Sequence, residues 1–414
     1  MEYKKAKSEI YILKNFLFVL FIVFCIQFTE LKLDVIKLSE LLLLLLTPFI
    51  YLKKINKWIL FFLVLFIFWF VQTILFNPIR SFFLLENVSI LKRPYLISIG
   101  RFLELISCVN LSAIIILVFK NKSKEEKIIF IKYIFDFSFF LMIVNVVFYY
   151  SYLNNIIENT RMVYWGDRLR GWFGEGGPYG LMLSFTYVLT FFYKSKYHNL
   201  KRFLIILVIY FLAKSKAGVV LVLIWYFIIY YKTIYKKLKE FSIIIVIMLA
   251  LLFSLIFVKL SKNYIYAISN VKKEMKERPT DINLVMGRIA GVFIFPEMIA
   301  DYPIFGIGLG NYPIMRNNPK YLEFIPKSPK GKTDAHGFGG LIQLLVDGGL
   351  VVFILFAFII YYLYVKIKRK KNKNENFLAI FLFFFIFGVQ IYFLYPWVLL
   401  GILISLNEKR KINE

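Results

Sequence analysis

The sequence is poor in the residues that most metal and redox sites need. It holds two cysteines, Cys25 and Cys108, and two histidines, His198 and His336. Both cysteines lie inside apolar segments, so they form neither a disulfide framework nor a CxxC metal site. HExxH, Walker and exposed Gly-x-Ser-x-Gly motifs are absent, as are acidic metal-binding triplets. These absences argue against zinc chemistry and ATP-driven transport, and we expect no metal and no cofactor.

Acidic residues are also scarce. The chain has 25 Asp and Glu against 52 Lys and Arg, a net charge of +27. The basic residues fall in short clusters between apolar stretches, which is how polytopic membrane proteins fix their orientation, so we expect no nucleic-acid partner. With 60% hydrophobic and 20% aromatic residues, the chain is no ordinary soluble domain. We therefore predict an all-α integral membrane protein.

Hydropathy predicts about twelve membrane-spanning helices, at about 17 to 25 apolar residues for each crossing. The predicted spans are 11–29, 36–52, 58–76, 95–119, 127–150, 176–193, 200–214, 217–231, 241–259, 340–365, 377–394 and 396–407. The seventh and eighth spans, and likewise the last two, are either a tight hairpin or one broken helix. The first apolar stretch is followed by no small-residue cleavage site, so we expect it to remain as a helix.

Basic clusters alternate along these spans as the positive-inside rule requires. If both hairpins are real, all the short loops rich in Lys and Arg fall on one side, together with the two ends of the chain. Both termini are then cytoplasmic. The polar segment 260–339, between the ninth and tenth spans, becomes a large extracytoplasmic loop. No internal repeat stands out, so residues 1–414 are expected to form a single polytopic membrane domain that includes this loop.

Five basic residues come out on the outward side of this topology: Arg168, Arg170, Lys214, Lys216 and Arg288. The positive-inside rule does not require cations there. Taken singly, each is more often an anchor at the membrane interface. As a group they are suited to holding a phosphate or pyrophosphate.

His336 lies just before the span that begins near Gly340, so its imidazole is expected at the outer membrane interface, two residues after Asp334. A neutral histidine there can accept a proton from a hydroxyl group. The alternative is a solvated loop histidine, which is also what we expect of His198 in its Lys-rich turn. Glu175, at the outer end of the sixth span, is a second candidate base.

Ionisable residues also occur within the predicted spans. Arg101 and Glu104 lie three residues apart in the fourth span, and Asp136 lies in the fifth. Charges at membrane depth mark either internal ion pairs or functional cavities. For Arg101 and Glu104 both alternatives remain open.

The predicted loop contains two recognisable local patterns. Residues 286–300 are amphipathic and predict a helix against the membrane surface or the core of the loop itself, with Pro296 as a possible kink. Gly306-x-Gly308-x-Gly310 follows no strand, so it is not a dinucleotide-binding motif. It predicts a tight turn that approaches another segment closely.

These residues resemble the bacterial O-antigen ligase and O-antigen polymerase superfamily. Arg288, Asp301-Tyr-Pro-Ile-Phe-Gly-Ile-Gly-Leu-Gly-Asn311, Asp334-Ala-His336 and Leu341-Ile-Gln-Leu-Leu-Val-Asp-Gly-Gly-Leu350 are similar to that family's outward loop and following helix. Arg168-Leu-Arg-Gly-Trp-Phe-Gly174, with Pro178, resembles its Arg-x-x-Gly-x-Phe segment. Ser215-Lys-Ala-Gly218 resembles its Ser-Arg-Gly turn, with Lys216 where the family usually has arginine. The first 150 residues agree only in the predicted layout of spans.

The resemblance implies metal-independent, inverting glycosyl transfer at the outer face of the bacterial cytoplasmic membrane, from a glycan carried on undecaprenyl pyrophosphate. Arg288 and Lys216 would hold the pyrophosphate, and His336 would orient or deprotonate the acceptor hydroxyl. Because lysine is a point charge without the arginine fork, Arg168 or Arg170 would share the duty of Lys216. Expected partners are the lipid-linked donor, a glycan acceptor, membrane lipids and a chain-length regulator protein.

The resemblance leaves the precise activity open. We expect a polymerase that joins lipid-linked repeat units into a surface polysaccharide, O-antigen or capsule. The first alternative is a ligase that transfers the glycan to lipid A core or to a protein. A flippase for lipid-linked glycans is the alternative from another class, because twelve spans with intramembrane charges also suit a transporter.

Overall fold

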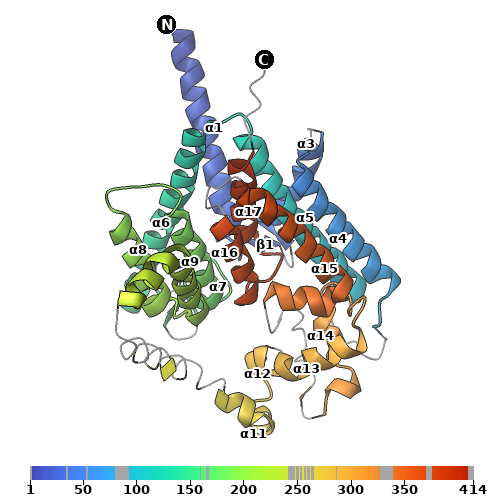
Figure 1. The fold of residues 1–414 in the computed structure, drawn as a ribbon. Coiled ribbons are helices and arrows are strands. Elements are labelled where there is room, and N and C mark those ends of the chain that lie inside the picture. Colours follow the sequence, from blue (N-terminus) through green and yellow to red (C-terminus); the bar gives the residue numbers. More distant parts are fainter. Residues whose placement is uncertain are drawn as a thin grey trace.

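The computed structural model of the protein describes residues 2–33, 36–52, 55–79, 93–158, 160–164, 167–240, 265–285, 287–323, 325–326, 339–369 and 375–408, with isolated positions between 248 and 262. Within these residues the regular secondary structure is helical except for two short β-hairpins (Figure 1). The predicted all-α class agrees with this architecture.

Several helices are suited to a membrane. Among the described residues, the helices that are long and apolar enough to cross a membrane are α4 (Lys57–Leu75), α5 (Pro94–Phe119), α6 (Lys124–Leu153), α9 (Lys216–Glu240, over Lys216–Lys236) and α15 (Gly340–Lys368). Shorter apolar helices are the second half of α1 (Glu2–Gln27), α16 (Glu375–Ile386) and α17 (Leu394–Leu406). The protein is therefore a multi-pass membrane protein. Most of the predicted span 241–259 lies outside the described residues, and the count of twelve stays a prediction.

Helices α5 and α17 form the centre of the bundle (Figure 1). Every residue of α17 from Leu394 to Ser405 is buried. A Cβ on Gly401 would lie 3.0 Å from the backbone oxygen of Ser112 in α5, so a small residue is needed at this crossing. Ser112 Oγ also donates a hydrogen bond of 2.6 Å to the carbonyl of Trp397. Close backbone approach and a hydrogen bond thus hold the two central helices together.

The predicted span 36–52 is not one helix. Its first residues form β2 (Ile36–Lys37), which pairs with β1 (Lys32–Leu33), and the rest divides into α2 (Leu38–Leu45) and α3 (Thr47–Tyr51). Pro48 lies in the first turn of α3. Because proline has no N–H to donate to the carbonyl four residues earlier, it interrupts the helix there.

The predicted pair 200–214 and 217–231 is a hairpin. It consists of α8 (His198–Leu207) with the π-helical turn η3 (Val208–Leu212), followed by α9. Gly218 lies against the side chain of Ile209, which a continuous helix would not allow. The expectation for His198 was wrong: the residue is 8% exposed and packs edge-on against Tyr193 at 4.6 Å, because the turn folds back on α7 (Gly176–Leu189).

The boundary predicted between the last two spans, at Tyr395-Pro396, is also wrong. Helix α16 ends at Ile386, and α17 begins at Leu394. Gly388 in the connection has a positive φ of +94°, and the carbonyl of Val389 accepts a hydrogen bond from the N–H of Gly340. Pro396 falls in the first turn of α17, where a proline needs no N–H partner.

The polar segment forms a cap at the end of the bundle opposite the start of α1 (Figure 1). Its helices are α11 (Val271–Glu277), α12 (Ile282–Val285), α13 (Arg288–Asp301), α14 (Tyr312–Met315) and the 3-10 turn η4 (Pro319–Tyr321). They share a buried core that includes Met275, Ile294 and Val346 of α15. Fully buried Arg316 donates to the carbonyls of Val285 at 2.6 Å and Pro326 at 3.0 Å. The predicted amphipathic helix is α13, and it packs in the core of the cap.

Candidate functional site

Three of the predicted basic residues meet at one edge of the bundle. Arg168 begins β4 (Arg168–Leu169), which pairs with β3 (Val163–Tyr164). Its Nη2 lies 3.4 Å and 3.5 Å from the carbonyl oxygens of Ala213 and Lys214. Lys214, in a left-handed conformation with φ +49°, forms an ion pair with Asp167. Exposed Lys216 begins α9. The structure thus brings Arg168, Lys214 and Lys216 together, although they come from different elements, and we call these three residues the basic edge.

The same edge carries the first turns of two helices, α7 and α9. Ser215, just before α9, donates its hydroxyl to the carbonyl of Gly177 in α7 at 3.0 Å. A Cβ on Gly176 would lie 2.6 Å from the carbonyl oxygen of Ala213, and one on Gly180 would lie 2.2 Å from Ser215 Cβ. Only glycine fits these contacts. Because helix N-termini carry positive potential and free N–H groups, two of them beside three cations make a favourable place for an anion.

Arg170 and Glu175 have local structural roles at this edge. Arg170 donates from Nε to the carbonyl of Arg161 at 2.6 Å and from Nη1 to the carbonyl of Gly174 at 3.3 Å. Its guanidinium therefore braces the loop that carries Arg168. Glu175 occupies the N-cap position of α7 and is exposed. A carboxylate there is stabilised by the helix dipole, and this structural role is separate from the predicted role of Glu175 as a base.

A second cluster of charged residues lies between α5 and the β1–β2 hairpin. Arg101 Nη1 is 2.6 Å from Glu104 Oε2, so the ion pair predicted as one alternative is present. It belongs to a larger network, because Lys37 Nζ lies 3.3 Å from Glu104 and 2.5 Å from Glu40. The guanidinium of Arg101 also lies 4.3 Å from the ring centre of Tyr392. Two cations and two carboxylates thus balance one another in a region shielded from water.

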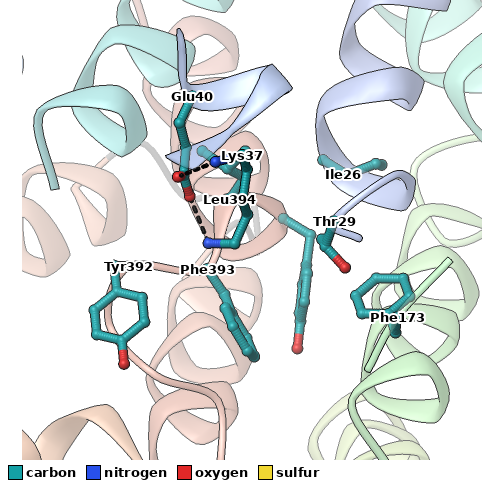
Figure 2. A pocket seen from close by; sticks show the side chains of 9 residues that line it. Ile26, Thr29, Lys37, Glu40, Phe173, Tyr392, Phe393 and Leu394 are labelled. Atoms are coloured by element: carbon teal, nitrogen blue, oxygen red, sulfur yellow. Dashed lines mark hydrogen bonds and ion pairs between the residues drawn. The ribbon is translucent and has the colours of Figure 1, made fainter. Parts of the chain in front are cut away.

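A small pocket lies between the Lys37–Glu40 ion pair and Phe173, as Figure 2 shows. Lys37 and Tyr392 line one side, and Phe173, from the segment after Arg168, lines the other. The pocket encloses about 260 Å³ of space including its opening. Thr29, also in its wall, donates its hydroxyl to the carbonyl of Trp172 at 2.9 Å. The segment that follows Arg168 is therefore fixed between the end of α1 and the pocket.

The glycine turn of the cap docks on a break in α15. Gly306, Gly308 and Gly310 have φ of +64°, +92° and +75°, which supports the predicted tight turn. Helix α15 is interrupted at Gly349, with φ +67° and ψ −172°. Near this break Asp347 accepts two hydrogen bonds from the turn. The N–H of Gly308 donates to the backbone carbonyl of Asp347 at 2.9 Å, and the N–H of Gly310 donates to its carboxylate at 3.1 Å. Backbone groups freed inside an apolar helix are thus satisfied by the cap.

Two membrane helices hold the other side of the turn. Gln72 of α4 donates to the carbonyls of Phe305 at 2.6 Å and of Gly348 at 2.9 Å. Ser98 of α5 donates to the carbonyl of Leu309 at 2.8 Å. A Cβ on Gly310 would lie 2.7 Å from Cγ of Arg101. The turn therefore joins the cap to the bundle directly beside the Arg101 network.

The structure describes only part of the two residues predicted to be catalytic. His336 and Asp334 lie outside the described residues, and of Arg288 the structure describes the backbone, which opens α13. Their roles stay predictions. Gly339, the described residue nearest to His336 in the sequence, packs against the backbone of Phe385, at the end of α16, and of Gly388, on the connection that leads to Tyr392.

Sequence reasoning missed Lys37, Glu40, Asp347 and Tyr392. Three of them could have been found. Lys37 and Glu40 lie three residues apart in the predicted span 36–52, and Asp347 lies in the predicted span 340–365, so the argument applied to Arg101 applies to them equally. Tyr392 carries no such signal, since its place beside Arg101 depends on how distant segments pack.

Comparison with protein families places residues 202–357 in the O-antigen ligase family. The matched range contains Lys214, Lys216, Arg288, Asp334 and His336, whereas Arg168 and Arg101 precede it. No curated protein matches the chain. Residues 202–357 of this multi-pass membrane protein thus match the O-antigen ligase family, and the match supports the resemblance to the O-antigen ligase and polymerase superfamily.

Proposed function

We propose that the protein is a membrane glycosyltransferase that polymerises oligosaccharide repeat units, carried on undecaprenyl pyrophosphate, into a surface polysaccharide such as O-antigen or capsule. The observation that carries this proposal is the family match over residues 202–357, which spans both Lys216 and His336. No metal is required, because the leaving group is already a stable pyrophosphate that cationic side chains can hold.

The basic edge supports a role in binding that pyrophosphate. Arg168, Lys214 and Lys216 gather where α7 and α9 both begin. Negative charge on the bridging oxygen grows as the glycosidic bond to the pyrophosphate breaks. Cations and helix N-termini fixed before the reaction stabilise this developing charge without reorganising. Arg288 is assigned to the same task from the resemblance.

His336 is the proposed general base. The acceptor hydroxyl oxygen attacks the anomeric carbon of the donor sugar, and its proton passes to the imidazole. The bond between the anomeric carbon and the pyrophosphate oxygen breaks, so undecaprenyl pyrophosphate leaves and the configuration inverts. A neutral histidine suits this transfer at physiological pH.

The proposed setting is the bacterial cytoplasmic membrane, with both termini in the cytoplasm and the cap outside. The arrangement in Figure 1 supports this topology, since the start of α1 and the end of α17 lie at one end of the bundle and α11 to α14 at the other. The donor lipid and the growing acceptor would both meet the basic edge from the outer leaflet. A chain-length regulator protein is the partner proposed for a polymerase, and no nucleic acid takes part.

A ligase is the second candidate, favoured by the description of the matching family as O-antigen ligase. It would use the same donor and the same residues but transfer the finished glycan to lipid A core or to a protein. In cells that lack the gene, loss of a polymerase leaves single repeat units attached to their final carrier. Loss of a ligase leaves long chains on undecaprenyl pyrophosphate.

The experiment is complementation of such cells with His336→Ala, Arg288→Ala and Arg288→Lys variants at matched expression. We expect His336→Ala and Arg288→Ala to abolish long chains while repeat units still reach the outer leaflet, and Arg288→Lys to retain part of the activity. The matched control is His198→Gln, because His198 is the other histidine and packs against Tyr193 away from the basic edge.

Undiminished long chains in the His336→Ala variant would refute the catalytic proposal. Repeat units trapped in the cytoplasmic leaflet would instead favour the flippase alternative. Wild-type activity of Arg288→Ala would remove the pyrophosphate role of that residue.

A further inference from the structure

Two lysines converge on one indole ring at the end of the bundle opposite the cap. Lys57 begins α4, and Lys366 lies in the last turn of α15. Between them are Trp58, 2% exposed, and Tyr362, 43% exposed. We call these four residues the Lys57–Lys366 cluster. Its side chains come from two helices that pack against each other and lie nearly 310 positions apart in the sequence.

The distances show how closely the two charges approach. Lys57 Nζ lies 5.3 Å from the ring centre of Trp58 and 5.2 Å from that of Tyr362. Lys366 Nζ lies 5.4 Å from the ring centre of the same tryptophan. The two ammonium nitrogens are therefore no more than about 11 Å apart, the sum of their distances to the shared ring centre. Both lie within the range of a cation–π contact.

Neither lysine has an ion pair with any residue that the structure describes. Other lysines in comparable positions do, such as Lys201 with Asp136 at 2.7 Å. The nearby carboxylate of Glu408 is instead hydrogen-bonded to Asn56, the N-cap residue of α4. Two like charges beside one ring repel each other, and the first turn of α4 adds positive potential. An anion placed between the ammonium groups would relieve this repulsion.

The surface beside the cluster is apolar. Phe61 and Val64 of α4 are 39% and 56% exposed, and Phe358 and Tyr361 of α15 are 65% exposed each. In a multi-pass membrane protein such a surface faces acyl chains. A ligand that combines an anionic headgroup with hydrocarbon chains therefore matches the whole region, whereas free phosphate matches only the charged part.

We propose that the Lys57–Lys366 cluster binds the headgroup of an anionic phospholipid, with its phosphodiester between the two ammonium groups and its acyl chains along α4 and α15. Tyr362 lies 3.5 Å from Lys57 Nζ through its hydroxyl and forms an edge of the site. The topology rule for basic loops does not account for this arrangement, because it requires only positive charge on one side of the membrane and not two cations over one ring.

The test is titration of the purified full-length protein in detergent with phosphatidylglycerol or phosphatidylcholine, with bound lipid counted by native mass spectrometry. We expect wild-type protein to prefer phosphatidylglycerol. The double variant Lys57→Gln, Lys366→Gln should bind it about 30-fold more weakly, which follows from about 1 kcal/mol for each basic residue near an anionic surface. Lys57→Arg, Lys366→Arg keeps both charges and should keep the preference.

The matched control removes two other lysines whose cation–π contact, among the described residues, is with the ring of a sequence neighbour. Lys196 lies 5.6 Å from the ring centre of Tyr197, and Lys232 lies 5.8 Å from that of Tyr231. We expect Lys196→Gln, Lys232→Gln to change the affinity less than about 3-fold. Equal loss in the two double variants, no loss in the first, or no preference in the wild type would each overturn the proposal. The outcome is independent of the proposed glycosyl transfer.

Discussion

Replacing Gly306 with alanine should release the cap from the membrane helices. Gly306 has a φ of +64°, and a Cβ there would lie 2.6 Å from the carbonyl carbon and oxygen of Asp347 and from the nitrogen of Gly349. These are backbone atoms of α15, so no side chain can move aside to make room. The turn must therefore withdraw from the break in the helix.

The cost has two parts. A left-handed conformation costs a residue with a Cβ about 1 to 2 kcal/mol. Withdrawal also removes at least two backbone hydrogen bonds, from Ile307 to Val346 at 3.0 Å and from Gly308 to Asp347 at 2.9 Å, each worth about 0.5 to 1.5 kcal/mol net. The free energy of docking the turn on α15 should thus become less favourable by about 2 to 5 kcal/mol, which lowers the docking equilibrium constant at least about 30-fold.

Limited proteolysis of the cap measures this equilibrium, because cleavage follows the population of the open form when opening is fast. We expect the Gly306→Ala cap to be cut at least about 30-fold faster than the wild type. Gly100→Ala is the matched control, since a Cβ on Gly100 meets nothing within 4 Å and improves helix propensity in α5. Equal cleavage rates for the two variants would refute the docking argument.

Two further predictions concern charges. Arg101→Gln should lower the free energy of unfolding in detergent by about 2 kcal/mol, because Glu104, 11% exposed at its side chain, loses its 2.6 Å partner but keeps Lys37 at 3.3 Å. Adding Glu104→Gln should restore part of this stability, and no restoration would contradict the network. Burial opposes ionisation of Asp301, but hydrogen bonds from Lys320 and Tyr321 outweigh it and lower its pKa below the usual 3.8. The ionised Asp301 therefore stabilises the folded cap above about pH 4. This stabilisation is lost as the pH falls through 3.8, the pKa of the unfolded chain, and then through the lower pKa of the folded state. Pepsin cleavage of the cap, normalised to that of denatured chain, should rise over this range in the wild type but not in Asp301→Asn.

Much of the fold could be predicted because lipid imposes simple rules. Apolar length predicts α4, α5, α6 and α15 within a few residues. The same rule fails at 36–52 and at Tyr395-Pro396, because the position of a helix end there depends on the local backbone and not on apolar length. Pro48 lies in the first turn of α3, directly after α2 ends, so it divides one apolar stretch. Pro396 also lies in a first turn, but the chain has already left the helix between Ile386 and Leu394, so the break comes earlier than the proline.

The candidate site was predictable only in part, and for a physical reason. The residue types of Arg168, Lys214 and Lys216 suggest an anion site by their charge alone. Their meeting depends on Gly176 and Gly180, which let α7 and α9 approach, and close packing between segments leaves no local pattern in a sequence. The Arg101 network is similar, since Lys37, which pairs with Glu104, comes from the β1–β2 hairpin, 67 positions before Glu104 in the sequence.

The break at Gly349 ties the assembly of a membrane helix to that of the cap. The open backbone groups of α15 are satisfied by residues 303–310, which precede the helix in the chain and so leave the ribosome before it. When α15 enters the bilayer, its partner has already been synthesised. Removing the cap would therefore expose unsatisfied peptide groups to lipid, so residues 260–339 cannot be deleted as an independent module. A segment outside the apolar helices here completes the secondary structure of a membrane-spanning one.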